Sequence, residues 1–162
     1  MIEIWFFKGI SFTSKIIKTF TWSDYSHVAV VFKPENKILE SWWKNGTNIL
    51  NINEIQHKPG TEIDIYVPKY SISISEQREL LEFSYKIFDK TKYDIFGVIG
   101  IALRKDIDKK DRWFCSEATL FLFNTFNFKL LETEPYKTTP GLLSWSPMLK
   151  FKETIKWKGS KI

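Results

Sequence analysis

The sequence predicts an α+β protein in which a small antiparallel sheet precedes a helical half. Strand-like segments separated by turn residues occupy residues 1–68, and helical periodicity dominates the residues that follow. The chain has 162 residues, of which 43% are hydrophobic and 17% aromatic. That length is enough for one hydrophobic core and too short for two, so we expect residues 1–162 to form a single domain.

Five segments of the first half have the β-branched, aromatic or alternating pattern of strands: residues 3–7, 26–32, 38–43, 48–52 and 62–67. Turn residues at positions 33–37 join the second segment to the third, which predicts a hairpin. Asn45 and Gly46 mark a tight turn before the fourth segment, and Pro68 ends the fifth.

A short helix interrupts the predicted sheet after its first strand. Thr13 or Ser14 is placed to cap it, and Ile16, Ile17 and Phe20 then share one face. We therefore expect one amphipathic helix among the strands.

Three longer helices are expected in the second half. Ser73 and Glu76 have the spacing of a capping box and start the first, and residues 94–103 form a second, strongly apolar helix. A charged loop follows, and the third helix begins at Cys115. Prolines then break the chain into turns, and residues 150–162 add an edge strand or lie loose.

Composition argues against several kinds of site. The single cysteine excludes an internal disulfide, and one Cys with two His does not match the spacing of a structural zinc site, so no metal and no cofactor are expected. The net charge of +5 comes mostly from lysines scattered singly along the chain. This pattern favours a solvated surface over a specific nucleic-acid partner.

Neither a secretion signal nor a membrane span is expected. The longest apolar run, residues 95–103, is about half of the ~20 residues that cross a bilayer. The N-terminus has no basic segment and no small-residue cleavage site. We expect a cytoplasmic protein, unless it leaves the cell by another route.

Cys115 lies in RWFCSEATLFLFNTF (residues 112–126), directly before an apolar run. Free cysteine is often a small buried hydrophobe, and this is one interpretation. The other is a nucleophile at a helix N-terminus, where the helix dipole and a nearby imidazolium lower the thiol pKa and free backbone N–H groups stabilise an oxyanion.

His27 favours the second interpretation. It begins an apolar strand on the face that also carries Ala29 and Val31, where an aliphatic residue would pack better. A strand histidine presented to a cysteine on a facing helix is typical of cysteine-nucleophile enzymes. A hydrogen-bonded histidine with no catalytic role is the alternative.

The stretches YSHVAVV (residues 25–31), ILE (residues 38–40) and WFCSE (residues 113–117) resemble the circularly permuted branch of the NlpC-type, papain-like superfamily that includes YiiX/YaeF-like proteins. In that branch the histidine strand comes first, a polar residue follows, and the cysteine helix comes last, as in this chain. The resemblance covers residues 4–143. It implies a papain-like α+β fold, with a small sheet or barrel packed against the helical half.

The resemblance also implies roles for individual residues. Cys115 is the nucleophile, His27 the base and Glu40 the residue that orients the imidazole. Tyr93 resembles an active-site tyrosine of the superfamily. Trp42 and Tyr25 are auxiliary or substrate-binding candidates, although the tryptophans are equally suited to fill the core.

The sequence alone does not decide which residue orients the imidazole of His27. An even-numbered hairpin loop would place Glu40 opposite Val31, roughly 13 Å from His27 along the sheet, so a bulge or a shifted register is required. Ser41, Asn45 and Asp64 are the other candidates for this role.

Two further acidic or titratable residues have simple interpretations. Glu117 is expected to be a partner of the helix dipole rather than a catalyst. His57, in a Pro- and Gly-containing stretch, is interpreted as an ordinary loop residue.

Three hypotheses for the function follow. The first is a cysteine peptidase or amidase, with cell-wall peptides as the substrate class that the family suggests. The second is a lipid or thioester acyl hydrolase or acyltransferase of the same superfamily. The third is a binding module without catalysis, which an unreactive thiol would indicate.

Overall fold

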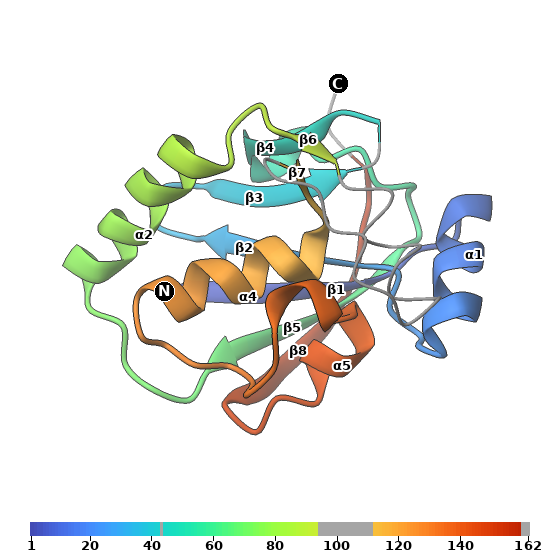
Figure 1. The fold of residues 1–162 in the computed structure, drawn as a ribbon. Helices are drawn as coiled ribbons and strands as arrows, with labels where there is room; N and C mark the ends of the chain where they lie inside the picture. Colours follow the sequence, from blue (N-terminus) through green and yellow to red (C-terminus); the bar gives the residue numbers. More distant parts are fainter. Residues whose placement is uncertain (43, 94–111, 160–162) are drawn as a thin grey trace.

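The computed structural model describes residues 1–42, 44–93 and 112–159. Within them, six strands form one sheet in the order β4-β3-β2-β1-β5-β8, and every neighbouring pair is antiparallel (Figure 1). The strands are β1 (Ile2–Lys8), β2 (His27–Phe32), β3 (Lys37–Trp42), β4 (Gly46–Asn51), β5 (Glu62–Pro68) and β8 (Leu149–Lys156). The predicted α+β class is confirmed.

Four α-helices occur in the described ranges: α1 (Phe12–Thr21), α2 (Ile74–Ile87), α4 (Cys115–Thr125) and α5 (Pro140–Ser144). The short strands β6 (Lys92–Tyr93) and β7 (Arg112–Trp113) pair in parallel, and η1 (Ile52–Glu54) and η2 (Pro135–Lys137) are single 3₁₀ turns. None of these helices is long and apolar enough to cross a membrane. The helix predicted at residues 94–103 and the charged loop after it lie outside the described residues.

The start of two predicted helices is confirmed. The Ser73 and Glu76 capping box begins α2, and α4 begins at Cys115. A turn was expected at Pro140, but this residue is instead the first residue of α5. Proline is tolerated there because the first N–H groups of a helix have no partner within the helix.

The sheet extends beyond the first 68 residues. β8 pairs with β5 along its length, so the C-terminal segment supplies the edge strand rather than lying loose. The strand at this edge of the sheet therefore comes from the C-terminal part of the chain, far in sequence from its neighbour β5.

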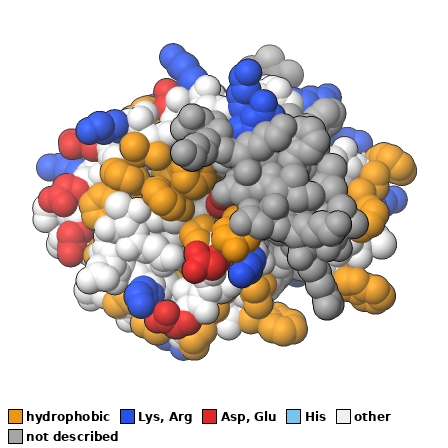
Figure 2. All heavy atoms as spheres, viewed as in Figure 1, with side chains coloured by type: hydrophobic (Ala, Val, Ile, Leu, Met, Phe, Trp, Pro, Cys, Tyr) orange, Lys and Arg blue, Asp and Glu red, His pale blue; other side chains and the backbone are white. Residues whose placement is uncertain are grey.

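Helix α1 differs from the prediction in its cap and its packing. Ser11, rather than Thr13 or Ser14, accepts the N-terminal hydrogen bond. The apolar stripe is not packed against the core, because Phe12 and Phe20 are 78% and 63% exposed. Figure 2 shows hydrophobic side chains at the edge of the molecule where α1 lies in Figure 1.

The two faces of the sheet bury separate apolar clusters. On one face, Val28, Val30 and Phe32 of β2 pack with α4, which lies across the sheet in Figure 1. On the other, Ala29 and Val31 pack in a smaller cluster made by the strands and the loop after β4. Alternate residues of β2 thus serve different cores.

The β2–β3 hairpin has a register that the loop length alone did not predict. Val31 lies opposite Ile38, and the ladder ends at the pair Val30 and Leu39. Continuing that register places Glu40 opposite Ala29, two residues closer to His27 than the even-numbered loop predicted. Because the shift is an even number of residues, Glu40 remains on the face of His27.

Candidate active site

His27 and Glu40 meet on the face of the sheet away from α4. His27 is paired across the sheet with Phe7, whose side chain belongs to the cluster on that face. Glu40 follows Ile38 by two residues and therefore points the same way. The two are diagonal neighbours on adjacent strands, within reach of long side chains.

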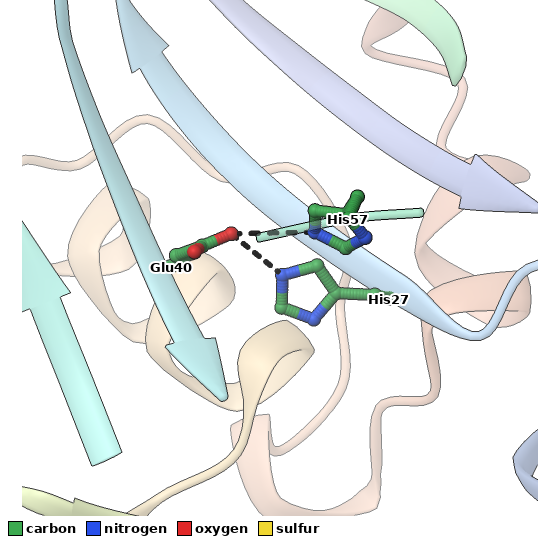
Figure 3. A group of neighbouring side chains, drawn as sticks. All are labelled: His27, Glu40 and His57. Atoms are coloured by element: carbon green, nitrogen blue, oxygen red, sulfur yellow. Dashed lines mark ion pairs between the residues drawn. The ribbon is translucent and has the colours of Figure 1, made fainter. Parts of the chain in front are cut away.

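A second imidazole joins them. Nε2 of His27 lies 3.6 Å from Oε2 of Glu40, and Nε2 of His57 lies 3.4 Å from the same oxygen. Figure 3 shows both rings directed at that one carboxylate oxygen. The three side chains are almost completely buried, with residue exposures of 3%, 6% and 8% for His27, Glu40 and His57.

These separations are longer than ordinary hydrogen bonds. Nε2 of His27, Oε2 of Glu40 and Nε2 of His57 have no hydrogen-bond partner within the described part of the chain. Native proteins rarely bury polar atoms in this way, and three that converge on one point require an explanation.

Aromatic rings enclose the three residues. Phe7 stacks on His57 with ring centroids 4.0 Å apart, and Trp42 packs edge-on against both imidazoles at 4.8 and 5.3 Å. A pocket of about 210 Å³ opens beside them and is lined by Trp42 and His57, among others. The cluster is therefore buried but lies next to a pocket that opens to the surface.

The pKa values of His27 and Glu40 are both lowered. Burial lowers the pKa of His27 below its ordinary value, and nearby His57 adds to this, while Glu40 opposes it. For Glu40, burial acts to raise the pKa, but polar contacts with the two imidazoles outweigh it and lower the pKa to about 2. The cluster thus favours neutral His27 beside an ionised carboxylate at neutral pH.

His57 reaches the site from the irregular loop after η1. Ile55 anchors this loop by inserting completely into the apolar cluster. The other end is held to the chain after β8, since Gly60 N–H donates to the Trp157 carbonyl and Trp157 N–H donates to the Thr61 carbonyl. His57 is thus a loop residue, as expected from the sequence, but its side chain is buried and lies against Glu40.

Cys115 is placed by the segment before α4. Ser41 of β3 donates a 2.6 Å hydrogen bond to the carbonyl of Trp113, and Thr47 donates to Ser41 in turn. Glu117, in the first turn of α4, accepts the N–H of Phe114, as suits a partner of the helix dipole. These contacts fix the N-terminus of α4 against the sheet.

The thiol lies against the backbone of β2. Cys115 is 6% exposed and packs in the cluster that contains Val28. Burial raises the pKa of the thiol to about 11, although hydrogen bonds from the backbone of Val28 and from Ser116 lower it in part. This is the opposite of the lowered pKa expected from the helix dipole, because desolvation of the thiolate is the larger effect.

His27 and Cys115 are therefore close along β2 but belong to different faces of it. The thiol contacts the backbone at Val28, the residue after His27, whereas the imidazole lies on the face of Phe7. The β2–β3 ladder ends at Val30, so β2 has no partner in that ladder beside these two residues.

The alternative third residues have other partners. Ser41 donates to the Trp113 carbonyl, and Asp64 accepts hydrogen bonds from Tyr25 and Thr154. The Asn45 carbonyl accepts a hydrogen bond from the Asn48 side chain. Glu40, by contrast, lies 3.6 Å from Nε2 of His27.

The auxiliary candidates separate in space. Trp42 contacts both imidazoles, as described above. Tyr25 instead packs with the α4-side core, donates a 2.6 Å hydrogen bond to Asp64, and has a raised pKa because of burial and that bond. Only the backbone of Tyr93 is described, and it pairs with Trp113. Position 43 lies outside the described residues.

The three clustered residues also fit a metal ion. Their ligand atoms all lie within 4.8 Å of one another, and each is one that Zn²⁺ or Fe²⁺ accepts. No structural metal was expected from the sequence, because one cysteine and two histidines cannot complete a four-ligand zinc site without carboxylates at unrecognised spacing.

Comparisons with known proteins bear on the fold. No protein-family model and no curated protein sequence matches this chain. Its structure is similar to the crystal structure of the metalloprotein YiiX from Escherichia coli O157:H7 (DUF1105), with a TM-score of 0.69 and 17% sequence identity over 96% of each chain. The YiiX-like resemblance predicted from the sequence is thus confirmed at the level of the fold.

Proposed function

We propose that this protein is a cysteine hydrolase that cleaves amide or peptide bonds through Cys115, His27 and Glu40. The observation that carries the proposal is the contact between Nε2 of His27 and Glu40, 3.6 Å apart, beside a thiol that lies against the next residue of β2. Because Glu40 occupies Nε2, Nδ1 is the nitrogen of His27 that remains for the thiol.

The mechanism begins with a protonated thiol. Its raised pKa means that His27 accepts the proton at Nδ1 as the sulfur attacks the substrate carbonyl. The N–H groups at the start of α4 stabilise the oxyanion. Return of the proton to the leaving amine gives an acyl-enzyme, and water deprotonated by His27 then releases the acid and the free thiol.

Glu40 is a positioning residue in this scheme. Its low pKa keeps it ionised over the whole working range of pH. The carboxylate stabilises the imidazolium that forms when His27 takes the proton, and it fixes the ring orientation from the Nε2 side. The proposal requires the thiol and Nδ1 to meet around β2, at the end where its ladder with β3 has stopped.

A second candidate substrate class is a lipid or thioester acyl group. The exposed apolar stripe of α1 favours it, since Phe12, Phe20 and the adjacent Trp22 lie in solvent beside Lys15 and Lys18. A helix with such a face suits the surface of an anionic membrane. The acyl-enzyme chemistry would be unchanged, with an alcohol or thiol as the leaving group.

YiiX is described as a metalloprotein, which suggests that an ion also belongs to this chain. The residues that would hold it are His27, Glu40 and His57, whose buried ligand atoms have no hydrogen-bond partner in the described structure. When bound, such an ion supplies Lewis acidity.

A substrate panel tests the proposal. Purified protein is incubated with stem peptides and, separately, with phospholipids and acyl thioesters, and released amines and fatty acids are measured. Amine release that Cys115→Ala abolishes and that Glu79→Ala, an exposed control on α2, leaves intact is the expected result. Release of fatty acids alone would support the second candidate, and turnover unaffected by Cys115→Ala would refute both.

A further inference from the structure

We infer that His27, Glu40 and His57 form a divalent transition-metal site, and that an ion bound there prevents His27 from acting as the base for Cys115. The inference rests on the proposed function for its second part. Its first part stands on the geometry of the cluster alone.

The spacing of the ligand atoms fits an ion. Ligand atoms around a tetrahedral Zn²⁺ with bonds near 2.0–2.1 Å lie about 3.3 Å apart. The separations between Oε2 of Glu40 and the two imidazoles, 3.4 and 3.6 Å, are close to this value. All three ligand atoms lie within 4.8 Å of one another, so the two imidazoles need only move toward a shared ion. An ion would also satisfy all three buried atoms that have no hydrogen-bond partner within the described chain.

His57 is explained by an ion and by nothing in the hydrolase mechanism. Glu40 needs only one imidazole partner to orient His27, yet a second one is held on the same oxygen by a loop pinned at both ends. Two histidines and one carboxylate are a common donor set for Zn²⁺ and Fe²⁺. The pocket of about 210 Å³ beside Trp42 and His57 gives an ion a way in.

His27 cannot be a metal ligand and the base for Cys115 at the same time, because both roles need the lone pair of a ring nitrogen. A neutral imidazole has one nitrogen that carries hydrogen and one that carries a lone pair. An ion at Nε2 takes the lone pair, so the hydrogen must be on Nδ1, the nitrogen assigned to the thiol. His27 then has no acceptor for the thiol proton, and Glu40 is drawn to the ion. Metal therefore acts as an inhibitor of the hydrolase.

The binding test uses the full-length protein after removal of metal with EDTA. Titration with Zn²⁺ by calorimetry and with Co²⁺ by visible absorption should show one ion per chain in wild type and in the exposed control Glu79→Ala. His57→Phe, which keeps a ring to stack on Phe7, should weaken binding by more than about 100-fold. Cys115→Ser should leave the Co²⁺ spectrum unchanged, because the sulfur is not a ligand.

The exclusion test measures alkylation of Cys115 by iodoacetamide at pH 7. Zn²⁺ should slow this reaction at least about 10-fold in wild type and Glu79→Ala, and the ratio of rates with and without Zn²⁺ should stay near one in His57→Phe. Absence of binding, or equal affinity in wild type and His57→Phe, overturns the metal site. Binding that leaves wild-type alkylation unchanged, or an equal slowing in His57→Phe, overturns the exclusion.

Failure of the hydrolase proposal is distinguishable from these outcomes. If metal-free His27→Ala is alkylated as fast as metal-free wild type, His27 is not the base for Cys115. The calorimetric and Co²⁺ results would then still decide whether the metal site exists.

Discussion

The two faces of the sheet are built differently around residues that are neighbours in sequence. Under α4, Val28 and Val30 pack with fully buried apolar side chains, and the one reactive group, Cys115, is held protonated by desolvation. On the opposite face, Ala29 and Val31 share a smaller apolar cluster with a polar group of two imidazoles and one carboxylate. The face under α4 is filled by apolar packing, whereas the opposite face keeps ionisable side chains in contact with one another.

The difference shows how one strand serves both stability and chemistry. Side chains of β2 alternate between the faces, so the α4 face can be filled for stability without changing the groups opposite. The proposed chemistry requires the thiol of Cys115 and the imidazole of His27 to meet at the end of β2, where its ladder with β3 stops.

Truncating the α4 face should give the largest loss of stability. Leu120 is completely buried in α4, so Leu120→Ala should lower the free energy of unfolding by about 2–5 kcal/mol through lost burial and a residual cavity. Urea denaturation measures this. Leu142→Ala, at a more exposed position of α5, is the matched control. A loss below about 1 kcal/mol for Leu120→Ala would mean that the α4 face is not the main core.

Acidification should instead act on the opposite face. The pKa of Glu40 is lowered to about 2 in the folded protein, so its contribution to stability is present above its ordinary pKa near 4.5 and is lost as pH falls toward 2. The loss is on the order of 3 kcal/mol. Because the folded pKa of His27 is also lowered, destabilisation starts as pH falls below the ordinary histidine value of 6.5.

Urea denaturation between pH 7 and pH 3 measures this dependence. Glu40→Gln should flatten it, and Glu62→Gln, at an exposed carboxylate on β5, should leave it as in wild type. Identical pH profiles for wild type and Glu40→Gln would contradict the ionised carboxylate.

The hydrogen bond that fixes the start of α4 against the sheet should give the smallest change. Ser41→Ala removes the donor to the half-buried Trp113 carbonyl and the acceptor for Thr47, which is completely buried. We expect a loss of about 1–2 kcal/mol in the free energy of unfolding. Thr47→Val removes only the second bond and should cost less. Equal stability of wild type and Ser41→Ala would show that this bond does not hold the start of α4.

Local signals were enough to predict the elements that carry the proposed chemistry. The β-branched run after His27 gave its strand and face, and the apolar run after Cys115 gave the start of its helix. Both signals come from residues that are close in sequence, so they can be recognised without knowing how the rest of the chain folds.

Residues placed by long-range contacts were predicted less well. The position of Glu40 depended on a hairpin register that differed by two residues from the simplest loop. His57 was missed because its loop is held by Ile55 in the core and by Trp157 after β8, and neither contact has a local signature. For the C-terminal segment, the sequence left open an edge strand or a loose tail. Pairing with β5, which is a long-range contact, decides for the strand β8.

The central claim is that His27 takes the proton of Cys115 across the end of β2. Its most direct test is the rate of Cys115 alkylation by iodoacetamide at pH 7 in metal-free wild type and His27→Ala, with folding checked by circular dichroism. The account predicts a rate about 10²-fold lower or more in the variant, because the thiol has a raised pKa and loses its base. Equal rates in two folded proteins would contradict it.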